Sequence, residues 1–315
     1  MVNMKVDVII PLYKPDKSLF EQIRRLRAQS VKINKIILIN TEKAYFDELL
    51  KNEDRALADE KIQVIHIKKH EFDHGGTRRM AVEYSDTEIF VMLTQDAVPT
   101  DKRLIERLTE PLRKLTPKVA VSYGRQLAGR DSGILERYTR SFNYPKDSRI
   151  KSMADMERLG VKTFFCSNVC AAYNRDVYDR LGGFAERTIF NEDMIYAAAA
   201  IKAGYSIAYV AEARVLHSHN YSCKQQFQRN FDLGVSQAEH PEVFAGISSE
   251  SEGKKLVIEA TRHLIEHGRF AAIPYFYLQC ASKYAGYLLG KKYRYLPEKV
   301  IMKCTTNKEY WNKER

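Results

Sequence analysis

Hydrophobic and polar positions alternate in blocks along the first 125 residues. Short apolar runs of strand length are separated by segments in which apolar residues recur at helical spacing. The predicted strands cover residues 6–13, 35–40, 62–67, 88–93 and 119–124, and the predicted helices cover 16–29, 43–51 and 101–114, with one more beginning at Gly76. This alternation predicts an α/β fold with a mostly parallel sheet flanked by helices. Ligands of such sheets bind beyond the carboxyl ends of the strands, where polar residues stand in this chain.

The pattern changes after residue 125. Residues 125–165 are polar and have no clear period, which predicts a loop with a helical piece that borders the site. Next we expect a buried strand at 166–173, a short helix ending at GGF (182–184), a helix opened by NED (191–193), and strands near 205–210 and 213–217. The segments from residue 222 onward are helical in pattern. We therefore expect two parts, residues 1–221 and residues 222–315.

The net charge limits the class of partner. The 315-residue chain carries a charge of +11, and residues 268–315 hold ten Lys or Arg against three Glu. Such a balance favours an anionic partner, which could be a nucleic acid, a nucleotide or an acidic membrane surface. The five cysteines form no CxxC pair, which indicates reduced cytosolic thiols rather than a disulfide framework. The N-terminal pattern implies no export, and no uncharged apolar run reaches the roughly 18 residues of a membrane-spanning helix.

The segment FDHGGTR stands where a predicted strand gives way to a helix. Its residues His74, Gly75, Gly76 and Arg78 combine close backbone approach, helix N-terminal N–H groups and a positive charge. This combination suits a phosphate. The segment is neither a Walker A nor a G-x-G-x-x-G motif, so neither an ATPase nor a dinucleotide fold is supported. An aspartate turn with a glycine-rich helix start is the alternative.

Two further groups of polar residues are candidates for chemistry. Asp96 follows the apolar strand EIFVML, where its carboxylate could bind a divalent cation, although a turn aspartate is the alternative. His217 and His219 could complete a metal shell, because alternate residues of a strand face one way. Glu192 and Asp193 begin a helix, where carboxylates serve either as caps or as a general base.

Taken in order, these motifs resemble a known family. VDVIIPLYKP, TQDAVP, GGF followed by NED and KAGY, and the late HSH resemble the family 2 glycosyltransferases of the GT-A fold over about residues 5–220. FDHGGTR resembles the donor loop of bacterial rhamnosyltransferases that use dTDP-rhamnose. The tail segment YRYLPEKVIMK resembles the streptococcal rhamnose-polysaccharide enzymes. The resemblance implies a GT-A, Rossmann-like nucleotide-sugar-binding domain with a C-terminal helical extension.

The resemblance also implies roles for individual residues. The nucleotide-binding set is Pro11, Tyr13, Thr41, His74, Gly75, Gly76, Arg78 and Gln95, the last of which stands near the position of a missing first carboxylate of the metal motif. Asp96 and His219 match the metal ligands, with Mg²⁺ or Mn²⁺ as the ion. Asp193 matches the catalytic base, and Glu192 positions it.

These roles predict an inverting transfer of L-rhamnose from dTDP-β-L-rhamnose to a lipid-linked saccharide in cell-wall polysaccharide biosynthesis. A UDP-sugar donor on the same fold is one alternative. A non-catalytic basic protein that binds nucleotide or RNA is another, disfavoured because the basic excess lies in the tail and no RNA-binding motif is found. A retaining hydrolase would need a second carboxylate facing the sugar, which we do not identify.

The tail raises a separate question of location. Residues 268–296 mix aromatic and basic side chains, which suits a helix in a membrane interface. A helix that packs in the core or in a homo-oligomer is the alternative. We expect a cytoplasmic protein held at the inner face of the plasma membrane by anionic lipid, with no nucleic acid as partner.

Overall fold

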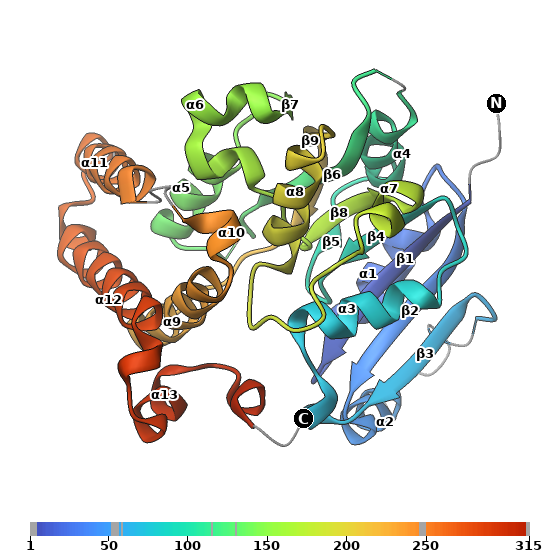
Figure 1. Cartoon of the computed structure of the whole chain (residues 1–315), viewed down its shortest axis with the longest axis horizontal. Helices are drawn as coiled ribbons and strands as arrows, with labels where there is room; N and C mark the ends of the chain where they lie inside the picture. The colour runs from blue at the N-terminus through green and yellow to red at the C-terminus, as the bar shows by residue number, and fades with distance from the viewer. Residues whose placement is uncertain are drawn as a thin grey trace.

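The computed structural model describes residues 5–51, 57, 59–114, 116–129, 131–245 and 250–312. These residues form a nine-stranded sheet in the order β3-β2-β1-β4-β8-β6-β9-β5, with β7 paired to β9 (Figure 1). The strands are β1 Val6–Tyr13, β2 Ile33–Thr41, β3 Ile62–Ile67, β4 Ile89–Leu93, β5 Val98–Pro99, β6 Val119–Leu127, β7 Arg149–Lys151, β8 Cys170–Asn174 and β9 Ser206–Leu216. Strands β3, β2, β1 and β4 are parallel, as are β6 and β9, whereas β8 runs antiparallel to both of its neighbours. The predicted α/β fold with a mostly parallel sheet is confirmed.

The helices cover both faces of the sheet and continue beyond it. They are α1 Ser18–Arg27, α2 Lys43–Leu50, α3 His74–Glu83, α4 Leu104–Thr109, α5 Ile134–Asn143, α6 Met156–Leu159, α7 Arg175–Arg180, α8 Glu192–Lys202, α9 Cys223–Glu239, α10 Pro241–Phe244, α11 Glu250–Glu266, α12 Ile273–Lys291 and α13 Glu298–Cys304. Side chains of β1 alternate between two cores: Val8 and Ile10 pack in one and Ile9 in the other. Both faces of this strand are therefore buried, as a parallel sheet between helical layers requires.

Three predicted boundaries are wrong. The two strands expected at 205–210 and 213–217 are the single strand β9, whose pairing with β6 slips so that Gly124 faces Val210 and Arg125 faces Arg214. The strand expected from residue 166 begins only at Cys170, because residues 166–169 form a loop. The helix expected at Gly76 begins at His74, because the Asp73 side chain caps it.

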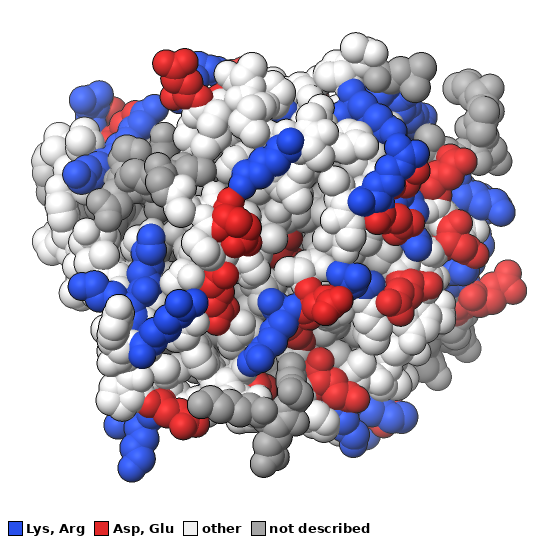
Figure 2. Space-filling model, viewed as in Figure 1, with Lys and Arg blue, Asp and Glu red and all other residues white. Residues whose placement is uncertain are grey.

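Charge of both signs covers the molecule. On the face shown in Figure 2, Lys and Arg side chains lie among Asp and Glu side chains. None of the helices in the described residues is long and apolar enough to cross a membrane. The positive net charge therefore does not gather into one basic surface on this face.

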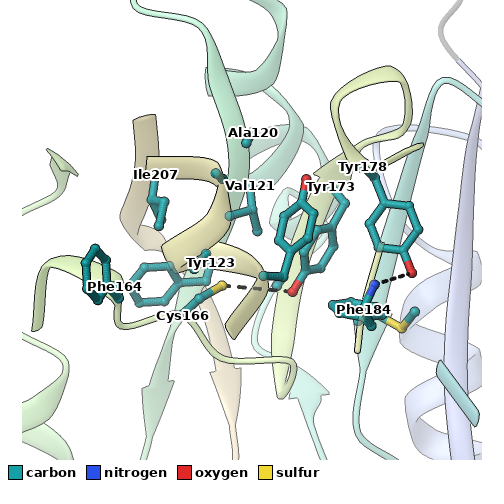
Figure 3. Packing of buried hydrophobic residues seen from close by; sticks show 14 of the residues in the cluster. Ala120, Val121, Tyr123, Phe164, Cys166, Tyr173, Tyr178, Phe184 and Ile207 are labelled. Carbon is teal, nitrogen blue, oxygen red and sulfur yellow. Dashed lines mark hydrogen bonds between the residues drawn. The ribbon is translucent and has the colours of Figure 1, made fainter. Parts of the chain in front are cut away.

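A cluster of aromatic side chains packs next to the start of α8. Phe90 of β4 stacks on Tyr173 of β8 with ring centroids 5.1 Å apart, and Phe184 meets Tyr173 edge-on at 5.2 Å. The Phe184 N–H donates to the Tyr178 hydroxyl at 3.0 Å, as Figure 3 shows. At Gly183, where φ is +73°, a Cβ would lie 2.8 Å from the Tyr178 ring. The GGF motif thus serves this packing.

The C-terminal helices lie to one side of the sheet, in orange and red in Figure 1. Helix α12 packs on α9 with their backbones in contact, since a Cβ at Gly290 would lie 2.1 Å from the Phe231 carbonyl oxygen. Helix α9 in turn holds the segment before α8, because the Ser236 hydroxyl donates to the Phe190 carbonyl at 2.7 Å. The helical extension is therefore built into the support of α8. A division between residues 221 and 222 stays a prediction.

Candidate active site

A cavity of about 510 Å³ opens at the edge of the sheet beyond β4 and β6. Its walls come from the start of α3, the segment after β4, helix α5, the loop 165–169, the start of α8, the segment 217–221 and helix α9. Of the predicted residues, the cavity is lined by His74, Arg78, Asp96, Glu192, Asp193, His217 and His219. Residues that are up to 145 positions apart in sequence, from 74 to 219, thus meet in one space. The position agrees with the rule that open α/β sheets bind ligands beyond their strand ends.

Three of these side chains form a group that fits a metal ion. One ligand atom each from Asp96, His217 and His219 lies within 4.8 Å of the others. Asp96 Oδ2 is 3.0 Å from His219 Nε2 and 3.4 Å from His217 Nε2. A carboxylate with two imidazoles is a donor set that divalent transition metals accept in proteins. The sequence named Asp96, His217 and His219 as candidates for a metal shell, and the structure brings all three together.

Hydrogen bonds on the Nδ1 side of the His217 ring, away from Asp96, orient this side chain. Its Nδ1 lies 3.0 Å from Gln126 Oε1, which orients the ring so that Nε2 faces Asp96. Gln126 is held in turn by Arg140, which donates to the same oxygen, and by Ser167 at 3.0 Å. Burial lowers the pKa of His217 despite the nearby Asp96 carboxylate, which favours the neutral ring that metal binding requires.

Glu192 is buried, Asp193 is half-buried, and the two share one partner, Asn168. The Asn168 backbone N–H donates to Asp193 Oδ2 at 2.8 Å, and its side-chain amide donates to Glu192 Oε1 at 3.0 Å. The Asn168 oxygen accepts from the Tyr173 hydroxyl at 2.7 Å, which ties it to the aromatic cluster. Burial, together with the neighbouring Glu192 charge, raises the pKa of Asp193 to about 7. A carboxylate with this pKa can accept a proton near neutral pH.

Asn191 does not cap α8, and Glu192 has a partner outside the helix. Asn191, the residue before α8, has φ +65° and directs its side-chain amide to Ser236 Oγ at 3.2 Å, away from the helix. Glu192 Oε1 lies 3.2 Å from Arg78 Nε, and both side chains are less than a tenth exposed. Burial alone would raise the pKa of Glu192, but the charge of Arg78, the hydrogen bond from Asn168 and the other neighbours together outweigh it, and the pKa is lowered. Glu192 is thus ionised and paired.

The donor loop is organised by Asp73. Its Oδ1 accepts from the N–H groups of Gly75 at 2.9 Å and Gly76 at 2.8 Å. The expectation that these N–H groups are free is therefore wrong. A Cβ at Gly75 would lie 2.2 Å from the Ala185 carbonyl oxygen, so this glycine allows α3 to pack on the loop before α8. A nucleotide contact of Gly75 and Gly76 stays a prediction.

Arg78 and His74 face the cavity from α3. Arg78 donates to the His74 carbonyl at 2.9 Å in addition to its pairing with Glu192. His74 packs against Phe72 and Phe190, and its burial lowers its pKa to about 4, so the ring is neutral. Arg78 already forms an ion pair with Glu192, and a contact of Arg78 with a diphosphate stays a prediction.

The other predicted nucleotide residues lie together at the ends of β1 and β2. Gln95 accepts from the Tyr13 N–H at 2.9 Å and donates to the Tyr13 carbonyl at 3.1 Å. Tyr13 lies opposite Thr41 in the β1–β2 ladder, and Pro11 lies opposite Ile39 in the same ladder. Tyr13 also meets the Tyr45 ring edge-on at 5.7 Å. The four residues do not line the 510 Å³ cavity, and their role in binding a base stays a prediction.

The sequence analysis missed Arg229. This α9 residue lines the cavity, with its guanidinium 4.8 Å from the Tyr221 ring centroid and 5.4 Å from that of Phe190. No carboxylate of the described residues pairs with it. Nothing in the sequence distinguishes Arg229 from the other residues of this polar helix. Its position over the cavity depends on how α9 packs.

Comparisons with known proteins agree with this geometry. Residues 7–182 match the model of glycosyl transferase family 2. The chain is 38% identical to the O-antigen chain rhamnosyltransferase RfbN of Salmonella typhimurium, over 98% of this chain and 96% of that protein. It is 42% identical to the O-antigen chain rhamnosyltransferase WbaN of Salmonella anatum, over 79% of each chain.

Solved structures show the same fold at low sequence identity. The mannosyltransferase PcManGT from Pyrobaculum calidifontis, solved with GDP-Man and Mn²⁺, has a TM-score of 0.59 at 13% identity and covers 91% of this chain and 86% of its own. S. aureus TarS 1-349, solved with UDP-GlcNAc, has a TM-score of 0.51 at 13% identity and covers 92% of each chain. The resemblance noted in the sequence is confirmed: the chain belongs to glycosyl transferase family 2 and is a glycosyltransferase.

Proposed function

We propose that the protein transfers L-rhamnose from dTDP-β-L-rhamnose to a saccharide acceptor, with inversion at the anomeric carbon. The observation that carries the proposal is that one cavity contains both the Asp96–His217–His219 group and Asp193. The choice of sugar is supported by RfbN and WbaN, both of which are named as rhamnosyltransferases. RfbN is related along nearly the whole chain, which supports a shared donor and a role in surface polysaccharide synthesis.

In this proposal Asp193 is the general base. It takes the proton of an acceptor hydroxyl while that oxygen attacks the anomeric carbon and the bond to the diphosphate breaks. The hydrogen bonds from Asn168 and Met194 fix the carboxylate, so no reorientation is needed during the transfer. A double displacement would need a second carboxylate at the sugar, and Glu192 is already occupied by Arg78 and Asn168. Direct transfer is therefore favoured over retaining hydrolysis.

The leaving diphosphate needs positive charge near it. Asp96, His217 and His219 would hold Mg²⁺ or Mn²⁺, and the ion would neutralise charge on the diphosphate. The carboxylate fits this role because hydrogen bonds from the histidines outweigh its burial and keep the pKa of Asp96 well below its usual range. Arg229 adds a guanidinium at the same cavity wall.

We also propose that the acceptor is lipid-linked and that the helical extension contacts an anionic membrane. Large hydrophobic side chains lie exposed at the two ends of α12, with Phe270 before the helix 61% exposed and Tyr295 after it 88% exposed. Lys292 and Arg294 stand beside Tyr295 in sequence, so basic groups accompany the aromatic ones. Such a surface suits the interface of a bilayer.

The donor is tested by a panel of dTDP-rhamnose, UDP-glucose, UDP-GlcNAc and GDP-mannose, with release of nucleoside diphosphate as the measurement. We expect dTDP-rhamnose to give the highest kcat/KM by at least about 10²-fold, since a site that hydrogen-bonds its substrate rejects analogues strongly. A preference for a UDP-sugar would contradict the proposed donor and leave the enzyme class in place.

The base is tested by Asp193→Asn, which keeps the shape and removes the proton acceptor. We expect turnover to fall by at least about 10²-fold with donor affinity unchanged. For the wild type, kcat/KM should rise with pH and level off above pH 7, because the carboxylate is the active form and its pKa is about 7. Asp179→Asn, at an exposed ion pair on α7, is the matched control. Near-normal turnover of Asp193→Asn would refute the assignment.

The metal group is tested by His217→Ala, with calorimetric titration of Mn²⁺ in the presence of dTDP as the direct measurement. We expect this variant to lose Mn²⁺ binding and to be insensitive to EDTA, so that mutation and chelator do not add. His70→Ala, at an exposed histidine before α3, is the control. Full transfer activity of the wild type after exhaustive chelation would show that the three residues serve another purpose.

Membrane contact is tested by sedimentation of the full chain with vesicles. We expect binding to vesicles with about 30% phosphatidylglycerol at about 0.1 M salt and weaker binding as salt screens the charges. The double variant Phe270→Ser/Tyr295→Ser should reduce this binding while donor affinity is kept. A full chain that ignores these vesicles and forms a stable dimer would assign the exposed surface to a homo-oligomer.

A further inference from the structure

A lysine is buried beside the loop 165–169, which forms one wall of the active-site cavity. Lys151 is the last residue of β7, which pairs with β9, and it is only 4% exposed. Its amino group donates to two backbone carbonyls, that of Lys162 at 2.9 Å and that of Phe165 at 2.5 Å. The same group lies 5.0 Å from the centre of the Tyr123 ring. Lys151 thus holds the chain where this loop begins.

Packing alone does not account for a lysine at this position. Among the described residues, no carboxylate forms an ion pair with Lys151. The other titratable and charged groups near it are Cys166, Asp155 and Arg149, and burial outweighs the first two, so the pKa of Lys151 is lowered to about 7. Burying an amine is costly, and a methionine would fill the same space without that cost. The hydrogen bonds to the two carbonyls therefore explain the lysine better than packing does.

The loop positions the two carboxylates of the site. Asn168 donates its backbone N–H to Asp193 at 2.8 Å and its side-chain amide to Glu192 at 3.0 Å. Tyr173 holds Asn168 from the sheet through a hydroxyl that donates at 2.7 Å. Lys151 holds the other end of the loop, at the carbonyl where it begins. Because the loop is short, both anchors determine where the Asn168 N–H points.

We propose that Lys151 is a positioning residue for the transfer reaction, which sets the orientation of Asn168 and, through it, the carboxylate of Asp193. The inference rests on the proposed role of Asp193 as the base. The hydrogen bond from the Asn168 N–H favours the ionised carboxylate, so a shifted loop weakens this bond and raises the pKa of Asp193. Both protonation states of Lys151 can hold the loop, since a neutral amine keeps two N–H groups, one for each carbonyl.

The role is tested by Lys151→Met, which fills the same space and removes the N–H donors. With whichever donor of the panel is turned over, we expect kcat to fall at least about tenfold, since a small misplacement of a reacting group slows transfer. Affinity for dTDP, measured by calorimetry, should stay unchanged. The rising limb of the kcat/KM profile should move to higher pH by at least about half a pH unit. Lys151→Arg, which keeps the N–H donors, should retain the wild-type profile, and Lys146→Met, at an exposed lysine before β7, is the control.

Hydrogen–deuterium exchange separates this inference from the proposed function, because it requires no transfer. We expect faster exchange in Lys151→Met only in peptides that cover residues 160–170. Unchanged exchange in these peptides would overturn the positioning role. Faster exchange throughout the protein would overturn it too, because it would assign Lys151 to global stability. A wrong base is detected separately, by Asp193→Asn.

The two measurements must agree. Faster local exchange with wild-type turnover and an unshifted pH profile would overturn the proposal, because the loop would then move without effect on the reaction. Where Lys151→Met does not fold, Lys151→Gln takes its place in both measurements. Its side chain is one atom shorter and cannot reach both carbonyls, so we expect the same changes to a smaller degree.

Discussion

Two adjacent carboxylates stand where α8 begins, Glu192 buried and Asp193 half-buried, and the repulsion between their charges determines how the surrounding residues are arranged. Two negative charges in a low-dielectric interior repel each other, so one must be neutralised or take up a proton. Arg78 and Asn168 neutralise Glu192. Asp193 receives two backbone N–H groups but no cation, and its pKa rises to about 7. The same constraint thus yields one permanent anion and one proton acceptor.

Support for this pair comes from several parts of the chain. Tyr173 fixes Asn168 from the sheet, and Arg78 reaches Glu192 from α3. From α9, Ser236 holds the segment before α8, and Arg229 of the same helix lines the cavity. The helical extension is therefore part of the catalytic structure. Helix α12 packs directly on α9 and so supports it from the far side.

The sequence predicted what local pattern determines. Alternating strands and helices specified the sheet, and strand ends identified Asp96 and His219, because an apolar strand followed by a polar residue marks a sheet edge. Packing between segments that are distant in sequence could not be predicted from the sequence. Strand β9 continues through a register slip that depends on its pairing with the distant strand β6. The role of Arg229 could not be predicted for the same reason, because this residue lines the cavity only through the packing of α9.

The central claim is a single displacement with Asp193 as base and no covalent intermediate, which inverts the configuration of the transferred sugar. The most direct measurement is the one-bond C1–H1 coupling constant of the transferred rhamnose in the purified product, obtained by nuclear magnetic resonance after reaction with dTDP-β-L-rhamnose. The account predicts the α-anomer. A β-linked rhamnose would mean retention, and it would contradict the role given to Asp193 and the site built around it.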